Sequence, residues 1–261
     1  TFAAWQWKAN GGTTASNTDG DITSTVQANT TAGFSIVTYT GNTSNNQTVG
    51  HGLGAKPGVI LIRNRTRAES WRLNHHAINN GTGMIIVNST SAYNTTGTTL
   101  MNSAATSSVF SVSTDWSVNG NYPFVAWCWA EKQGYSRFGK YVGNSNVNGP
   151  FIYLGFMPAF VMIKRVDAGT TYSSWAMFDN KRLGYNPTGG PESLYANRNY
   201  AEGKRGEGSS NTSEVRIDML SNGFKVKDGG SDEINDAGDT YLYMAFAESP
   251  FVAGGVPTTA R

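Results

Sequence analysis

The chain repeats itself, and this self-similarity constrains its architecture more than any single motif does. The apolar block FVAWCWAE at residues 124–131 recurs as YMAFAE at 243–248 and as FAAWQWK at 2–8. Two further pairs of blocks recur in the same order, GFSIVTYTGN (33–42) with GYSRFGKYVGN (134–144), and KPGVILIR (56–63) with MPAFVMIK (157–164). A period of roughly a hundred residues is too long for a solenoid or propeller repeat and is typical of tandem domains.

The composition favours short strands joined by turns. Charged residues make up only 15% of the chain and Gly contributes 31 residues, while 7 Trp, 12 Tyr and 12 Phe can fill a core. Alternating or apolar runs, such as 33–40 and 59–62, are separated by clusters of Gly, Asn, Ser and Pro. The expected fold is all-β, with two tandem related antiparallel β-sandwich modules of jelly-roll or concanavalin-like type.

The repeats also predict the domain boundaries. We expect residues 1–32 to hold the terminal strand of a preceding module plus a polar linker, 33–133 to form the first module, 134–252 the second, and 253–261 a tail. Because residue 1 is not Met and residues 2–8 resemble the last strand of a module, we expect the numbering to start inside a longer polypeptide.

Charge and apolar content exclude several classes of function. The net charge of +2 gives no electrostatic reason to expect nucleic acid or an anionic membrane as a partner. No apolar run approaches the length of a membrane span, so membrane insertion is not expected. Cys128, the only cysteine, lies in an apolar strand and is expected to be a small buried hydrophobe.

Metal sites find little support in the residue spacing. The three histidines are His51, in the glycine-rich run 49–54, and the adjacent His75 and His76, which would point to opposite faces of a strand. No metal site is therefore predicted, and no cofactor is expected. The acidic loop 228–239 is interpreted as a solvated hairpin tip, with calcium as an alternative through Asp228, Asp232, Asp236 and Asp239.

Catalysis is not expected. Glu214 and Asp218 would share one face of a strand, but Arg216 lies between them, which favours a neutralised surface over an acid and base pair. Glu131 and Glu248 each end a repeated strand, and repetition at a structural place favours a structural role.

Aromatic residues near turns are better candidates for binding, because sugar rings stack on flat aromatic side chains. The candidate glycan-binding residues are Trp71, His75, Tyr135, Tyr172 and Trp175. Trp71 and Trp175 also follow the repeated blocks at similar distances, so a role in the core of each module stays an alternative for both.

The repeated blocks carry a resemblance to a known family. Residues 17–57, with NTDGDITS, GFSIVTYTG and VGHGLGAKP, and residues 134–165 and 241–251 resemble a domain of uncharacterised function that is widespread in tailed phages, mostly aquatic ones. The resemblance covers nearly the whole chain. It implies a virion structural protein of the tail-fibre or receptor-binding type, and it brings no catalytic residues.

The resulting expectation is a tail or tail-fibre component on the exterior of a phage particle, with an adhesive role toward a host-surface glycan. Its expected partners are itself, as a homo-oligomer and most often a trimer, and other virion proteins. Two alternatives stay open: a capsid decoration or cement protein, and a glycan-degrading enzyme with a concanavalin-like sandwich.

Overall fold

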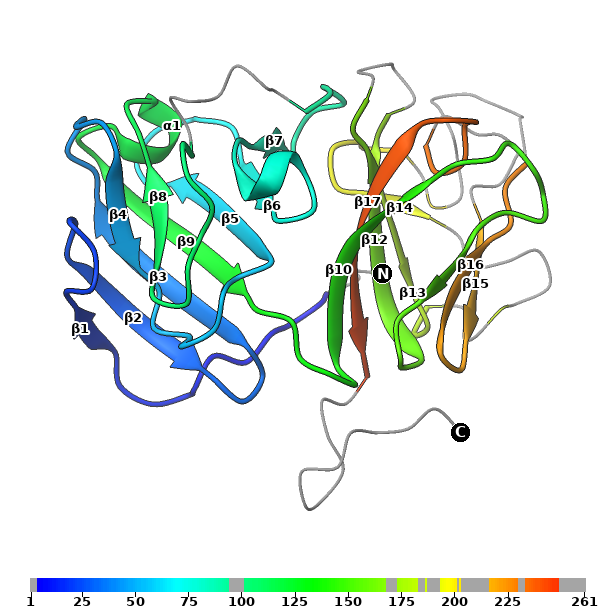
Figure 1. Cartoon of the computed structure of the whole chain (residues 1–261), viewed down its shortest axis with the longest axis horizontal. Coiled ribbons are helices and arrows are strands. Elements are labelled where there is room, and N and C mark those ends of the chain that lie inside the picture. The colour runs from blue at the N-terminus through cyan, green and yellow to red at the C-terminus, as the bar shows by residue number, and fades with distance from the viewer. Residues whose placement is uncertain are drawn as a thin grey trace. The chain divides into compact units, whose positions relative to one another are not determined.

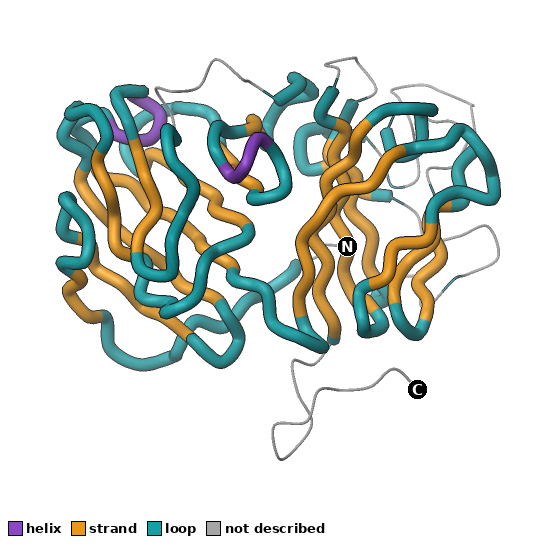
Figure 2. The backbone as a smooth tube through the Cα atoms, viewed as in Figure 1, coloured by secondary structure: helices purple, strands orange, loops and turns teal. Residues whose placement is uncertain are grey.

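The computed structural model describes residues 4–93, 101–167, 173–182, 186, 193–200, 202, 216–229 and 233–248. The chain divides into two compact units (Figure 1): unit 1 comprises Thr1–Val87 and Tyr93–Glu131, and unit 2 comprises Asn88–Ala92 and Lys132–Arg261. Nearly all regular structure is β, as Figure 2 shows, which confirms the expected all-β class. Within the described residues no helix is long and apolar enough to span a membrane.

Unit 1 packs a large antiparallel sheet against a small one. Its elements are β1 (Ala15–Asn17), β2 (Ser24–Asn29), β3 (Phe34–Thr40), β4 (Gln47–Gly50), β5 (Val59–Asn64), β6 (Arg72–His75), the 3-10 helix η1 (Asn79–Gly81), β7 (Ile85–Ile86), β8 (Val109–Val112), α1 (Trp116–Asn119) and β9 (Pro123–Trp129). The large sheet has the order β1-β2-β3-β9-β5-β6-β7, and β4 pairs with β8. Alternate residues of both sheets, such as Val37, Ile60 and Phe110, meet in one buried cluster.

Unit 2 is built in the same manner. Its strands are β10 (Ser136–Val142), β11 (Phe151–Tyr153), β12 (Pro158–Arg165), β13 (Trp175–Asp179), β14 (Leu194–Tyr195), β15 (Ile217–Leu220), β16 (Gly223–Val226) and β17 (Thr240–Ala247). One sheet has the order β10-β17-β12-β13-β14 and the other β11-β16-β15, with antiparallel pairing throughout. Val161, Phe178 and Phe224 belong to a separate buried cluster between these sheets.

The two units place the repeated sequence blocks at matching positions. The order β3-β9-β5-β6-β7 in unit 1 matches β10-β17-β12-β13-β14 in unit 2, and β4-β8 matches β11-β16. Tyr39 of β3 donates its hydroxyl to the Val118 carbonyl at 2.6 Å, and Tyr141 of β10 donates to the Ile234 carbonyl at 2.7 Å. Burial raises the pKa of both tyrosines, as expected for neutral core hydroxyls.

A buried asparagine fixes the turn after each of these tyrosine strands. The side-chain carbonyl of Asn119 accepts the Asn42 N–H at 3.0 Å, and that of Asn235 accepts the Asn144 N–H at the same distance. Both asparagines are 0% exposed. Because a buried donor without a partner costs about 1–3 kcal/mol, each asparagine stabilises its turn by satisfying main-chain groups.

The described part of residues 1–32 differs from the expected terminal strand and linker in two respects. Residues 4–8 are described without a strand, although Trp7 packs edge-on against Trp129 with ring centroids 5.8 Å apart. The expected linker instead contains β1 and β2, and β2 pairs with β3 along its whole length. The alternation in β2 is carried by small residues, with Ser24 and Val26 buried, so its apolar signal is weak.

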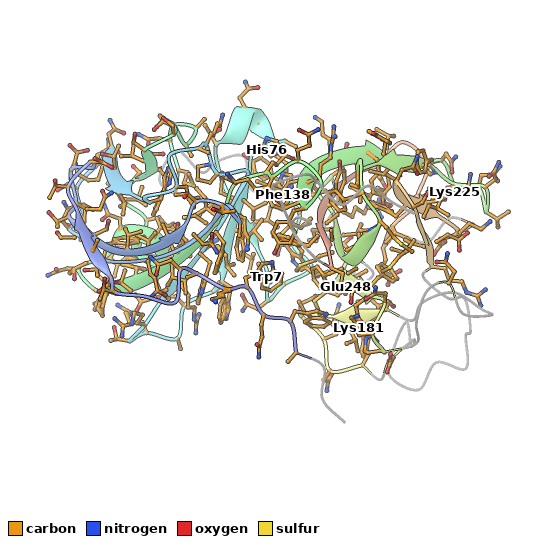
Figure 3. All side chains as sticks on the ribbon, turned by 90° about the horizontal axis from the view of Figure 1, so that it is seen from below. Trp7, His76, Phe138, Lys181, Lys225 and Glu248 are labelled. Atoms are coloured by element: carbon orange, nitrogen blue, oxygen red, sulfur yellow. The ribbon has the colours of Figure 1, made fainter. Side chains whose placement is uncertain are left out.

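Burial and pairing bear on two other expectations. Cys128 is buried, as predicted, and burial raises the pKa of its thiol to about 12. Glu248, at the end of the repeated strand β17, forms an ion pair with Lys181, and Figure 3 shows the two side chains together. This contact fits the structural role that the sequence analysis favours for Glu248.

Candidate binding surface

The most exposed tryptophan of the described residues belongs to a cluster in unit 1, here called the aromatic-arginine cluster: Arg67, Glu69, Trp116 and Tyr122. The Trp116 side chain is 58% exposed, and its ring centroid lies 6.2 Å from that of Tyr122. The guanidinium carbon of Arg67 lies 5.4 Å from the Trp116 ring centroid and 5.0 Å from that of Tyr122. One guanidinium therefore contacts both rings through cation–π interactions.

The hairpin between β5 and β6 positions Arg67. Asn64, the last residue of β5, is 2% exposed, and its side-chain carbonyl accepts the main-chain N–H groups of Thr66 and Arg67, both at 2.9 Å. An asparagine that bonds the backbone two and three residues ahead forms a defined turn. The Arg67 Nη1 then donates to the Tyr122 hydroxyl at 2.9 Å, and its Nε lies 3.6 Å from Glu69 Oε1.

The short helix α1 positions Trp116. Asp115 is its N-cap, and the Asp115 carboxylate accepts the Ser117 N–H at 2.8 Å, so the first helical turn carries the indole outward. At the end of the turn, a Cβ on Gly120 would lie 2.9 Å from the Tyr122 ring and 3.0 Å from the Trp116 carbonyl. Glycine at this position therefore lets the Tyr122 ring lie close to the helix.

The aromatic-arginine cluster suits a ligand with both apolar and hydroxyl faces. An exposed indole offers a flat surface for the C–H face of a sugar, and the adjacent guanidinium and carboxylate can donate to and accept from hydroxyl groups. The described members make no arrangement of nucleophile and base. The chemistry available at this surface is stacking and hydrogen bonding.

Unit 2 carries an ion-pair network at the matching position. The Gly41 N–H donates to the Tyr122 carbonyl at 3.0 Å, and the Gly143 N–H donates to the Asp239 carbonyl at 2.9 Å, so Tyr122 and Asp239 occupy corresponding places. Asp239 forms an ion pair with Arg165. Among the described residues, the place in unit 2 that corresponds to Tyr122 thus holds an ion pair instead of an aromatic ring.

The family comparison covers both units. The family model for a domain of unknown function, DUF7483, matches residues 1–250. The chain belongs to this family. Comparison with curated proteins gave no match, and comparison with solved structures gave none.

None of the sequence-predicted aromatic residues that the structure of this DUF7483 chain describes is a member of the aromatic-arginine cluster. Trp71 is 36% exposed and stacks on Trp127, with ring centroids 5.6 Å apart, while the guanidinium carbon of Arg63 lies 5.4 Å from the Trp71 centroid. Tyr135 is half-buried, and burial raises its pKa. Tyr172 lies outside the described residues.

Two of the candidate glycan-binding residues are buried. Trp175 is 2% exposed and His75 is 3% exposed, so neither offers a ring face to a ligand. For Trp175 this burial fits the alternative role in the core. His75 ends β6, and its Nδ1 accepts the Ala77 N–H at 3.2 Å. Because the strand stops there, His76 is not held on the opposite face, and the two imidazole rings stack 5.3 Å apart.

The His51 side chain forms hydrogen bonds with main-chain groups. Its Nδ1 accepts the Leu53 N–H at 3.2 Å and its Nε2 lies 3.3 Å from the Thr106 carbonyl, which assigns the proton to Nε2. Burial lowers the pKa of His51. In the described part of the chain, no three His, Cys, Asp or Glu side chains are arranged to hold a metal ion.

Within the described part of the acidic loop 228–239, residues 228 and 233–235 are buried, while residues 229, 237 and 238 are exposed. Asp228 is 7% exposed, and its carbonyl accepts the side-chain amide of Asn235. Arg165 Nη2 lies 3.5 Å from Asp236 Oδ2 and also pairs with Asp239, so a guanidinium contacts two of the four carboxylates suggested for calcium. Asp232 lies outside the described residues.

Partial burial raises the pKa of Asp239, with Asp236 and Asp167 adding to this effect and Arg165 opposing it. Of the paired carboxylates considered for catalysis, Glu214 lies outside the described residues. Asp218 lies 4.0 Å from Lys227 Nζ at the surface.

Trp116 and Tyr122 were missed by the sequence analysis. The signal that could have identified the surface is a tryptophan in the short polar segment 113–121, between the apolar runs 109–112 and 123–129. A turn cannot bury so large a side chain unless another element covers it.

Proposed function

We propose that this chain is a structural and adhesive component of a phage particle, in the tail or tail fibre, that binds a host-surface glycan through the aromatic-arginine cluster of unit 1. The resemblance of the repeated blocks to a tailed-phage domain supports the virion assignment. In this proposal the protein is not an enzyme, acts at the particle exterior, and has other copies of itself and other virion proteins as partners.

We also propose that the two units are tandem related β-sandwich modules. The matching strand orders support this, and so do the paired contacts of Tyr39 with Tyr141 and Asn119 with Asn235. Tandem modules let one copy keep the scaffold while the other changes its surface loops.

The exposure of Trp116 is the single observation that carries the binding role. A side chain of this size left 58% exposed, with a guanidinium and a phenol beside it, offers a ligand a flat apolar face next to hydrogen-bonding groups. The matching place in unit 2 holds the ion pair between Arg165 and Asp239 instead. Because unit 2 forms its sheets without the aromatic-arginine cluster, the cluster is not needed to form this arrangement of strands.

The test is binding of the purified chain to a panel of bacterial surface polysaccharides. Trp116→Ala should weaken binding by about tenfold or more, because a stacked aromatic contact contributes about 1–2 kcal/mol. Trp71→Ala is the matched control, since Trp71 is also partly exposed and lies beside an arginine.

Equal binding by wild type and Trp116→Ala would overturn the assignment of the cluster. Binding to no glycan at all would remove the adhesive role and favour a decoration or cement protein. Release of shortened oligosaccharides would instead indicate the glycan-degrading enzyme.

A further inference from the structure

One side of unit 1 is closed by residues 15–29, here called the cover segment. Its strand β2 pairs with β3 at the edge of the large sheet. Just before β2, the Ile22 N–H donates to the Thr48 carbonyl at 3.0 Å, and the Asp21 carboxylate accepts the Thr48 N–H at 3.1 Å. The cover segment therefore contacts the outer edges of both β3 and β4.

Unit 2 has the same two edges without a cover among the described residues. β10 and β11, which match β3 and β4, are the outermost strands of their sheets (Figure 1). The Gly143 N–H, just after β10, donates to the Asp239 carbonyl. In an antiparallel pair the residues that bond to the partner alternate, so the main-chain N–H and C=O groups of the odd-numbered residues of β10 point toward β17. The main-chain groups of Lys140 and Val142 therefore point away from β17.

The β4 residues that contact the cover segment in unit 1 differ from the residues at the corresponding positions of β11 in unit 2. Val49 of β4 pairs with Phe110, and Ile152 of β11 pairs with Phe224, each at the buried centre of its strand. The flanking residues correspond accordingly, Thr48 to Phe151 and Gly50 to Tyr153.

In unit 2, two exposed aromatic side chains therefore occupy the positions at which β4 contacts the cover segment in unit 1. A Cβ on Gly50 would lie 1.6 Å from Oδ1 of Asn17, and a Cβ on Gly20 would lie 2.6 Å from the Thr48 carbonyl oxygen, so these glycines let the cover segment lie close against β4. Tyr153 fills the corresponding place in unit 2 and is 58% exposed, while Phe151 is 46% exposed. An intrachain cover of the unit 1 kind would not fit against these rings.

Two valines extend this apolar surface. Val142 ends β10 and is 55% exposed, and Val147 in the following loop is 65% exposed. Valine offers neither a flat ring for a sugar nor a hydrogen bond, so these two side chains do not suit a sugar ligand. The composition of this side favours a protein partner over a glycan.

The charges on β10 indicate that its protein partner presents an acidic surface. Arg137 and Lys140 are exposed on β10, and neither has an ion pair within the described part of the chain. Two copies of β10 facing each other would bring like charges together. The turn between β1 and β2 carries exposed Asp19 and Asp21, and β1 is the outermost strand of its own sheet.

We propose that the uncovered side of unit 2, formed by β10 and β11, is the docking surface for a second copy of this chain, which binds through its β1 edge and the acidic turn at Asp19. Contact between two different surfaces is heterologous, so it closes into a ring or continues as a filament. This inference rests on the self-association in the proposed function and is independent of glycan binding.

The test is the mass of the full-length chain in solution, measured by sedimentation over a range of concentrations. The wild type should form assemblies larger than a monomer. Lys140→Glu and Asp19→Lys should each weaken assembly by about tenfold or more, since like charges then face each other. The variant with both substitutions should recover assembly, because the opposite charges are restored in reverse.

The apolar part is tested with Phe151→Ser and Tyr153→Ser combined, which should also reduce assembly. Trp116→Ala is the matched control and should assemble like the wild type even if it loses glycan binding, so failure of either proposal is distinguishable. Circular dichroism of each variant shows whether it is folded.

A monomeric wild type, or an unaltered mass for Lys140→Glu, would overturn the docking surface. Loss of assembly in both single variants without recovery in the double variant would overturn the pairing with Asp19.

Discussion

At the scale of single residues, Lys164 is the most unusual group in unit 2. Its side chain is 0% exposed, and its Nζ donates to the carbonyls of Thr90, Arg165 and Ser173 at 3.2, 2.7 and 2.9 Å. Burial, together with the charge of Arg165, lowers the pKa of Lys164 to about 7. The three carbonyls satisfy the amine but do not compensate for its removal from water.

This lysine predicts that the free energy of unfolding of unit 2 rises with pH. The unfolded lysine titrates near 10.4, so between about pH 7 and 10 the unfolded chain binds a proton that the folded chain releases. Stability should therefore increase across this range, by at most about 1.4 kcal/mol per pH unit. Above it, Tyr141 opposes the gain, because burial raises its pKa.

The measurement is amide hydrogen exchange in β12 and β17 at pH 7.5 and 9.5, corrected for the intrinsic exchange rate. Lys164→Met should abolish the rise of stability with pH, since methionine has no group that titrates. Lys164→Arg keeps the charge and should abolish it too. A slope that persists in both variants would assign the effect to another group.

At the scale of elements, the cover segment shows how a polar sequence can complete a sheet. β2 has little apolar content, yet its pairing with β3 satisfies main-chain groups that an edge strand would expose. Asp21 adds a second attachment, because its carboxylate accepts both the N–H and the hydroxyl of Thr48, at 3.1 and 2.7 Å.

Asp21→Ala should therefore loosen the cover segment. We expect a loss of about 1–2 kcal/mol in the unfolding free energy of unit 1, because the Thr48 N–H loses its acceptor. Faster amide exchange at Ile22 and Thr48 is the local readout. Asp19→Ala, two residues away and bonded only to Asn17, is the control and should change stability by less than about 0.5 kcal/mol. Equal effects of the two substitutions would contradict the role of Asp21.

At the scale of the whole molecule, each unit has a buried cluster of its own. Phe110 is 0% exposed and packs edge-on against Tyr39, with centroids 6.1 Å apart. Phe224 is also 0% exposed and packs against Tyr141 at 6.3 Å. The clusters around Phe110 and Phe224 share no residue.

Because the two units have separate cores, we expect each unit to have its own free energy of unfolding. Phe110→Ala should lower the unfolding free energy of unit 1 by about 3–5 kcal/mol, and Phe224→Ala should lower that of unit 2 by a similar amount. Hydrogen exchange resolved by peptide distinguishes the two units. If either substitution reduced protection equally in both, the units would unfold as one body.

Local pattern was a good guide where one face of a strand is strongly apolar. The runs at 33–40 and 59–62 predicted β3 and β5, and the buried state of Cys128 followed from its apolar neighbours. Local pattern was a poor guide for β2, whose inward side chains are small. It did not predict the contacts of the loop at 228–239, where Arg165 pairs with Asp236 and the Asn235 side-chain amide donates to the Asp228 carbonyl.

The candidate site could not be read from the same pattern. Trp71, Trp116 and Trp175 look alike in sequence, yet they are 36%, 58% and 2% exposed. Exposure depends on which distant elements pack over a side chain. The arginines beside the two exposed rings come from β5, for Arg63, and from the turn that follows β5, for Arg67.

The sequence by itself determined the all-β class and the repetition of strand blocks, because period-two alternation and turn residues act over a few neighbours. Only the tertiary structure decided that residues 15–29 close one side of unit 1, that the corresponding side of unit 2 presents Phe151 and Tyr153, and that Trp116 is exposed. Those outcomes depend on pairing and packing between residues far apart in the chain, which local periodicity does not encode.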